Sequence, residues 1–158
     1  MNLRIPPPRR DTWSNWAKTW SCRPVLRAAP ADLDGLIAAV RAAAARELPI
    51  RVAGTGHSLM PLARTAGCLI VTEHLRRVLR IEEDEIEVEA GARLGDVEET
   101  AWEVGLSLEG GTNYSKMSAG GLIATGAHGS SPTHGTLSSR VVGVRLVTAA
   151  GDLVTLDA

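Results

Sequence analysis

The chain has 158 residues, of which 44% are hydrophobic, and it carries a formal net charge of −1. This size and composition predict one folded domain with a real core, and the lack of excess positive charge argues against a nucleic-acid binder. No apolar run reaches the roughly 18–20 residues of a membrane span. The Pro- and Arg-rich start also lacks the apolar stretch of a secretory signal. We therefore expect a cytoplasmic protein without a membrane span.

The N-terminal segment divides into two parts. Residues 1–12 are expected to form an extended arm, because consecutive prolines favour a polyproline-like backbone. Trp13, Trp16 and Trp20 follow at spacings of three and four residues. This spacing fits either an aromatic face on a short helix or a set of anchors that hold the segment across the domain. Core packing of these side chains is the favoured interpretation.

The next elements are predicted from hydrophobic periodicity. A helix is expected over residues 30–47, with Asp32 in its first turn and one apolar stripe made by Leu33, Leu36, Ile37, Val40 and Ala44. Pro49 ends it, and residues 50–53 then predict a short buried strand. Residues 68–71 predict another apolar strand.

The second half repeats this mixture of strands and helices. Alternating apolar residues around 83–84 predict a hairpin over 81–88. Leu94, Val97, Ala101 and Val104 predict an amphipathic helix that ends at Gly105. Residues 142–147 and 153–156 flank a turn at 150–152 and predict a second hairpin. Strands and helices therefore alternate with short links, which is typical of an α/β or α+β fold.

A glycine loop follows the strand at 50–53. Gly54 and Gly56 permit turns that are closed to other residues. Successive N–H groups exposed in such a turn form a concave anion site that suits a phosphate. Because His57 lies inside the loop, its side chain is expected to touch whatever the loop binds.

A second segment, residues 110–131, combines many glycines with hydroxyl groups and His128. Small residues fit a place where a large flat ligand lies against the main chain, and Leu122 and Ile123 are too apolar for a solvated linker. Ser118 is expected to open a short helix whose N-terminal amides face that ligand. The segment therefore predicts a binding site.

Several common sites do not fit these residues. The dinucleotide fingerprint would need its third glycine at Leu59, and no Gly-Lys-Ser/Thr of a P-loop follows. The histidine and cysteine spacings match no common zinc pattern, so no metal is expected. The two cysteines, Cys22 and Cys68, are expected to be buried free thiols in a reducing compartment. No hydrolase nucleophile elbow is present.

Three segments together resemble the FAD-linked oxidases of the vanillyl-alcohol-oxidase (PCMH) type. They are residues 13–17 (WSNWA), 51–58 (RVAGTGHS) and 118–129 (SAGGLIATGAHG). Within that superfamily the chain looks most like the aldonolactone and alditol oxidases, the relatives of gulonolactone and arabinonolactone oxidase. The resemblance extends over nearly the whole chain, with both glycine segments in the expected order.

This resemblance implies an α+β FAD-binding domain over residues 13–158, built of two small α/β subdomains with the flavin between them. It implies a loop around the pyrophosphate made by Ala53, Gly54, Thr55, Gly56, His57 and Ser58. It implies a lining for the ribityl chain and isoalloxazine made by Ser118, Ala119, Gly120, Gly121, Thr125, His128 and Gly129. Adenine contacts would come from the stretch between Val142 and Val147.

The resemblance also implies a special role for His57. It matches the histidine that many relatives bond covalently to the flavin 8-methyl carbon. The physical chemistry is compatible, because an imidazole with an ordinary pKa of about 6.5 is largely neutral and nucleophilic near pH 7. Covalent attachment of FAD through His57 is therefore expected.

The activity implied is oxidation of a sugar alcohol or aldonolactone by hydride transfer to the flavin, with oxygen or another acceptor as reoxidant. Relatives of this type continue into a substrate domain that this chain lacks. We therefore expect the N-terminal part of a longer oxidase and assign no catalytic residue. The alternatives are a non-catalytic flavin-binding module that needs a partner chain, a structural domain, or a sterol or other alcohol oxidase of the same superfamily.

Overall fold

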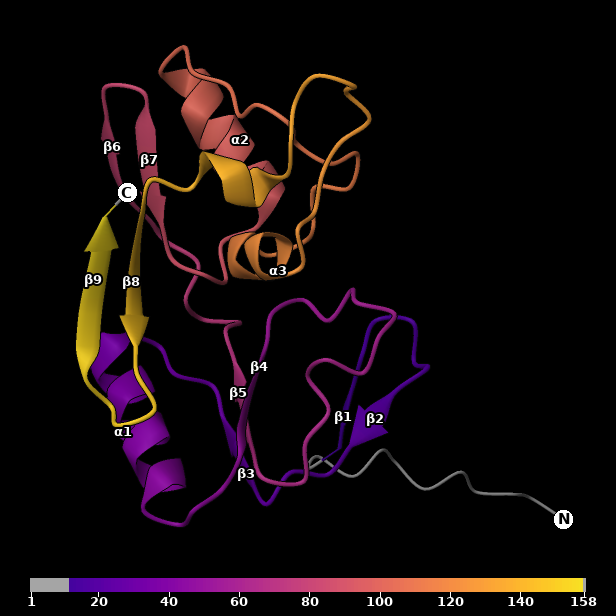
Figure 1. The fold of residues 1–158 in the computed structure, drawn as a ribbon, viewed down its shortest axis with the longest axis vertical. Coiled ribbons are helices and arrows are strands. Elements are labelled where there is room, and N and C mark those ends of the chain that lie inside the picture. Colours follow the sequence, from indigo (N-terminus) through magenta and orange to yellow (C-terminus); the bar gives the residue numbers. More distant parts are fainter. Residues whose placement is uncertain (1–11, 158) are drawn as a thin grey trace, which may run out of the picture.

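A small parallel sheet lies at the centre of the first half of the molecule (Figure 1). The computed structural model describes residues 12–157, so the expected arm lies outside the described residues apart from Thr12. Three strands form the sheet in the order β3 (Leu26–Ala28), β5 (Cys68–Val71), β4 (Ile50–Ala53). Both neighbours run parallel to β5. All four residues of β5 are buried, as expected for a central apolar strand.

Helix α1 (Leu33–Ala44) covers one face of this sheet. The Asp32 carboxylate caps it by accepting a hydrogen bond from the Gly35 N–H at 2.8 Å. The helix is shorter than the predicted 30–47, and its apolar stripe differs from the prediction at both ends, since Leu33 is 36% exposed. Ala43 is fully buried whereas Ala44 is exposed. Ala43 follows Leu36 by seven residues and so lies almost directly above it, while Ala44 is turned further round the helix.

The opposite face of the sheet packs against the N-terminal segment. Strands β1 (Trp13–Ser14) and β2 (Ser21–Cys22) pair antiparallel. Trp13 and Cys22 pack against the buried side chains of Leu69 and Val71. Core packing is thus confirmed for Trp13. It is wrong for Trp16, which is 63% exposed.

Two further expectations for this half need correction. Strand β4 is only partly buried, and Val52 is 58% exposed, because β4 lies at the edge of the sheet with β5 as its one neighbour there. Both cysteines are free thiols, but only Cys68 is buried; Cys22 keeps part of its surface exposed. Burial raises the pKa of the Cys68 thiol, which keeps it in the protonated form.

The second half begins with the predicted hairpin, formed by β6 (Val78–Glu82) and β7 (Glu85–Val88). Arg77 and Glu89 close its open end, with the Arg77 guanidinium 2.7 Å from a Glu89 carboxylate oxygen. Burial alone would raise the pKa of Glu89, but hydrogen bonds from Arg77 outweigh this effect and lower it. The charged form of Glu89 is therefore stabilised in the folded protein.

Helices α2 (Leu94–Glu103) and α3 (Ala119–Ala124) pack above the first half, followed by the short 3₁₀ helix η1 (Leu137–Arg140) (Figure 1). Leu94, Val97 and Ala101 form the buried face of α2, as predicted, whereas Val104, expected on the same face, is 55% exposed just after the helix ends. Gly105 ends the helix with a positive φ of 81°, which also agrees with the prediction.

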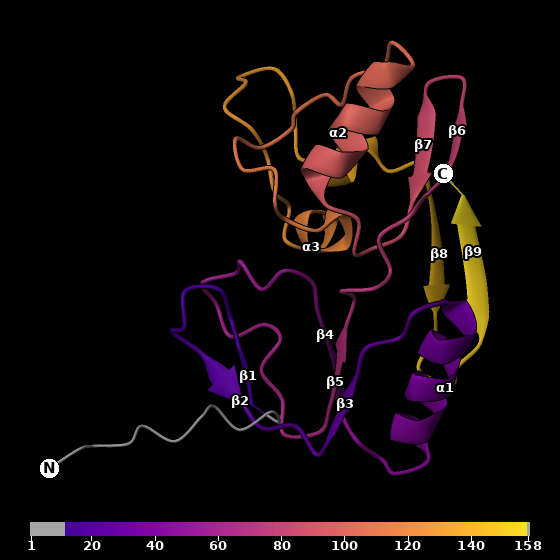
Figure 2. The same cartoon turned by 180° about the vertical axis from the view of Figure 1, so that it is seen from behind.

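The C-terminal hairpin joins the two halves. Strands β8 (Gly143–Val147) and β9 (Leu153–Asp157) pair antiparallel and run from α1 to the β6–β7 hairpin (Figure 2). Arg41 of α1 donates to the Gly151 carbonyl at 3.1 Å, and Arg145 of β8 pairs with Glu87 of β7. Within residues 12–157, no helix is long and apolar enough to cross a membrane.

Candidate functional site

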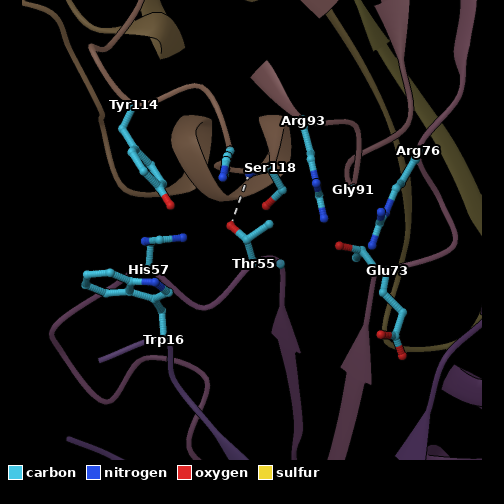
Figure 3. A pocket seen from close by; sticks show the side chains of 12 residues that line it. Trp16, Thr55, His57, Glu73, Arg76, Gly91, Arg93, Tyr114 and Ser118 are labelled. Carbon is cyan, nitrogen blue, oxygen red and sulfur yellow. Dashed lines mark hydrogen bonds between the residues drawn. The ribbon is translucent and has the colours of Figure 1, made fainter. Parts of the chain in front are cut away.

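A cavity of about 460 Å³ lies between the two halves of the molecule. The loops that follow β4 and β5 form one wall, and the segments around α2 and α3 form the other. Gly54, Thr55, His57 and Ser118, all expected from the sequence, line it together. The Ser118 N–H donates to the Thr55 hydroxyl oxygen at 3.3 Å and links the two walls (Figure 3). The structure therefore brings the two glycine segments to one site.

The close approach of these walls depends on Gly54. An added Cβ at Gly54 would lie 1.9 Å from the Ser118 hydroxyl oxygen, so any side chain there would push the segments apart. Ala53 is buried directly before it, and its carbonyl accepts a hydrogen bond from Thr72 N–H at 3.1 Å. Strand β4 and the end of β5 thus fix where the loop begins.

The rest of the loop is held by the N-terminal segment. Gly56 has a φ of 73°, in the region that favours glycine, and its carbonyl accepts from the Trp16 N–H at 2.8 Å. The Asn15 amide donates to the Ser58 carbonyl at 3.1 Å. Gly56 and Ser58 thereby bind the N-terminal segment on the side of the loop away from the cavity, while the side chains of Thr55 and His57 line the cavity.

One end of the cavity is aromatic (Figure 3). The His57 ring lies between Trp16, stacked at 4.9 Å between ring centroids, and Tyr114, tilted at 4.8 Å. Burial lowers the pKa of His57 below its ordinary value. His57 is therefore a neutral imidazole at pH 7, which leaves a nitrogen lone pair available. Tyr114 was not singled out from the sequence, because a lone tyrosine in a loop gives no pattern.

The other end of the cavity is polar and positively charged, and sequence reasoning missed most of it. Its lining consists of Thr72, Glu73, Arg76, Gly91, Arg93 and Lys116. The side chains of Arg93 and Arg76 both point into this end (Figure 3). A Cβ at Gly91 would lie 1.9 Å from the Thr72 carbonyl oxygen, so the turn before α2 packs directly on the end of β5. The sequence offered one sign of this end of the cavity, namely a glycine and an arginine, Gly91 and Arg93, directly before the helix predicted from Leu94.

The second glycine segment differs from the expectation in one respect. Ser118 does precede a short helix, but the first amides of α3 do not face the cavity. The Ala119 and Gly120 N–H groups donate to the carbonyls of Ala92 and Ala90, each at 2.8 Å. A Cβ at Gly120 would lie 2.9 Å from the Ala90 Cβ. These residues are therefore used to pack α3 on the turn at 90–92.

The remaining predicted residues do not line this cavity. Gly121 lies within α3, and Thr125 follows its end and donates its hydroxyl to the Gly121 carbonyl at 2.8 Å. His128 is exposed, and the Gly129 N–H donates to the Gly110 carbonyl at 3.1 Å.

The two valines predicted to flank an adenine lie elsewhere. Val142 is 51% exposed just before β8. Val147, at the end of β8, packs against the core under α1. No group of three or more His, Cys, Asp or Glu side chains that could hold a metal ion occurs between residues 12 and 157.

Comparison with known proteins identifies the family to which this fold belongs. The family model described as "FAD binding domain" matches residues 24–157. The chain belongs to this FAD-binding family. It is 37% identical over 155 residues to a D-arabinono-1,4-lactone oxidase of Eremothecium gossypii, covering 94% of this chain and 29% of that protein. It is 34% identical to an L-gulonolactone oxidase of Scyliorhinus torazame, covering 89% and 32%.

Solved structures agree with the family. The crystal structure of 6-hydroxy-D-nicotine oxidase from Arthrobacter nicotinovorans matches with a TM-score of 0.75 and 25% identity, over 83% of this chain and 29% of that one. The fold is therefore an α+β FAD-binding domain of the vanillyl-alcohol-oxidase (PCMH) type, as predicted. The chain spans about 30% of the length of the curated relatives it matches.

The residues of the cavity suit FAD. An aromatic end with His57 fits a flat ring system, since rings pack favourably in stacked or tilted pairs. A cationic end with a buried Arg93 Nε that has no hydrogen-bond partner fits a negatively charged group. The lack of a side chain at Gly54 and Gly91 lets the two walls pack close together. FAD combines a flat ring and a diphosphate in one extended molecule.

Proposed function

We propose that this chain is the FAD-binding portion of an oxidoreductase that oxidises an aldonolactone or a sugar alcohol. The observation that carries the proposal is the meeting of both glycine segments at one cavity with His57 at its aromatic end. The lactone oxidases among the relatives support the substrate class. Bound FAD would accept the hydride from a carbinol carbon as the hydroxyl proton leaves and a carbonyl forms, and oxygen or another acceptor would take both electrons.

We further propose that His57 holds the flavin covalently. The neutral imidazole, kept free of a proton by burial, would replace a C–H bond of the flavin 8-methyl group with a C–N bond. Two electrons and two protons leave in this step and pass to the same acceptor. Trp16 and Tyr114 fix the ring orientation from either side.

Acid precipitation of the purified protein tests the attachment. We expect a yellow pellet from the native protein, because a covalent bond survives unfolding, and a colourless pellet from His57→Ala. His134→Ala is the matched control, since that histidine is exposed and does not line the cavity; its pellet should stay yellow. A colourless pellet from flavin-saturated native protein would rule out the covalent bond.

Substrate reduction tests the activity. In the whole oxidoreductase that contains this FAD-binding portion, adding aldonolactones or alditols without oxygen should bleach the visible absorbance of the flavin, and admitting oxygen or an artificial acceptor should restore it. Unchanged absorbance with every lactone and sugar alcohol, in protein that retains FAD, would contradict the substrate class. It would then favour the alternatives, a non-catalytic flavin-binding module or an oxidase of bulkier alcohols.

The remaining assignments of the site stay predictions within this proposal. They are the ring-side contacts of Thr125, His128 and Gly129 and the adenine contacts of Val142 and Val147. The domain limits of 13–158 and the cytoplasmic location stay predictions as well.

A further inference from the structure

We propose that Arg93, assisted by Arg76, binds the diphosphate group of FAD and supplies the positive charge that the glycine loop lacks. The sequence patterns pointed to backbone amides as the phosphate ligands, and the geometry of the cavity adds these two charged side chains to them. The inference rests on the FAD-binding role of the proposed function and adds the residues that select the diphosphate.

The first argument is the unsatisfied state of Arg93. Its Nε atom is buried and has no hydrogen-bond partner, the one such side-chain atom found between residues 12 and 157. An arginine side chain stays charged in proteins, so a buried N–H without an acceptor costs free energy. A ligand with negatively charged oxygens would remove that cost.

The second argument is that the cations in the cavity lining have no carboxylate partner. Among the ion pairs of the described residues, none includes Arg76, Arg93 or Lys116, the three cations that line the cavity. Glu73 is the one acidic residue in that lining, and its carboxylate turns away from both guanidinium groups (Figure 3). The cavity therefore has an excess of unpaired positive charge.

The third argument is that the formal positive charge at this end comes from side chains. The N–H groups of Ser118, Ala119 and Gly120 donate to Thr55, Ala92 and Ala90 within the protein, and the N–H groups of the glycine loop are neutral dipoles. Neutralisation of an anion at this end then falls to the charged side chains. A guanidinium presents parallel N–H groups that match two phosphate oxygens at once, and this geometry favours arginine for a diphosphate.

The position of Arg93 is fixed by the fold. It adopts an extended conformation directly before α2 and forms an isolated antiparallel bridge with Ser118. From there its guanidinium enters the cavity beside Thr55, at the opposite end from the stack of Trp16, His57 and Tyr114 (Figure 3). The ring of FAD would accordingly lie at the His57 end and the diphosphate at the Arg93 end.

Flavin binding by the apoprotein tests this assignment. The measurements use a His57→Ala background, in which no covalent bond can hold the flavin, and compare FAD with riboflavin, which has no phosphate. We expect Arg93→Met to weaken FAD binding roughly 10- to 100-fold, the range for a charge-assisted hydrogen bond. Riboflavin binding should change by less than about twofold. Arg76→Met should act in the same direction but more weakly.

Two controls separate this role from a structural one. Arg51→Met, at an exposed arginine of β4, should leave both affinities unchanged. The thermal midpoint of the Arg93→Met apoprotein should stay the same or rise, because a buried unpaired N–H is removed. Equal losses for FAD and riboflavin, a fall in the apoprotein midpoint, or unchanged FAD affinity would each overturn the assignment. Failure of the parent protein to bind FAD would instead overturn the proposed function itself.

Discussion

The two glycine segments meet at the same cavity but contribute to it in different ways. The loop after β4 gives Gly54, Thr55 and His57 to the lining. The second segment, residues 110–131, gives Tyr114, Lys116 and Ser118 to the lining, and none of its glycines. The glycines of the second segment serve close packing, as Gly120 does against Ala90. A glycine-rich sequence can thus mark contact between two parts of the protein as well as contact with a ligand.

The largest expected effect comes from closing the gap at Gly54. Its new Cβ in Gly54→Ala would lie 1.9 Å from the Ser118 Oγ and 3.1 Å from the Ser118 Cβ. We expect a loss of about 2–3 kcal/mol in the free energy of unfolding, typical of overpacking a buried site, measured by urea unfolding of the apoprotein.

Ser118→Gly removes both atoms that the new Cβ meets. The double variant Gly54→Ala/Ser118→Gly should therefore be more stable than the sum of the two single changes predicts. Strict additivity of the two changes in the free energy of unfolding would show that the side chains at positions 54 and 118 are not in steric conflict.

A smaller effect is expected for the hydrogen bond between the segments. Thr55→Val keeps the shape of the side chain but removes the acceptor for the Ser118 N–H, which belongs to a residue only 2% exposed. The loss should be about 1 kcal/mol. Thr125→Val is the matched control, because that exposed hydroxyl donates within its own helix turn; it should cost less than about 0.5 kcal/mol. Equal losses at the two positions would contradict the special role of the Thr55 bond.

The smallest effect concerns the pH dependence of stability near His57. Burial lowers the pKa of His57, so the unfolded chain takes up its proton near pH 6.5 while the folded protein does so only at lower pH. The stability of the apoprotein should therefore fall as the pH drops below about 6.5 and level off below the folded pKa. Denaturant unfolding of wild type and His57→Gln should show curves that converge or cross in this range. Parallel curves would refute a burial-lowered pKa.

Much of the fold followed from local pattern. The strand at Cys68–Val71, the hairpin around 83–84, the amphipathic helix ending at Gly105 and the C-terminal hairpin were all predicted and are all present. The predictions of burial were wrong where the packing of neighbouring elements determines which side chains are exposed. Val52 is exposed because β4 is an edge strand, and Ala43 replaces Ala44 because the sheet meets that side of α1. Periodicity identifies an apolar stripe, but it does not say how far a partner covers it.

The sequence by itself determined the family and the loop with His57, because the glycine and histidine pattern is local and specific. Only the tertiary structure decided which groups face the cavity. Trp16, Arg93 and Tyr114 come from three separate segments, and no local pattern shows that their side chains share one cavity. The amides of α3 turn away from the cavity because Ala90 and Ala92, far earlier in the chain, offer them carbonyls. Such partners are set by how the two halves pack, and packing depends on the whole chain at once.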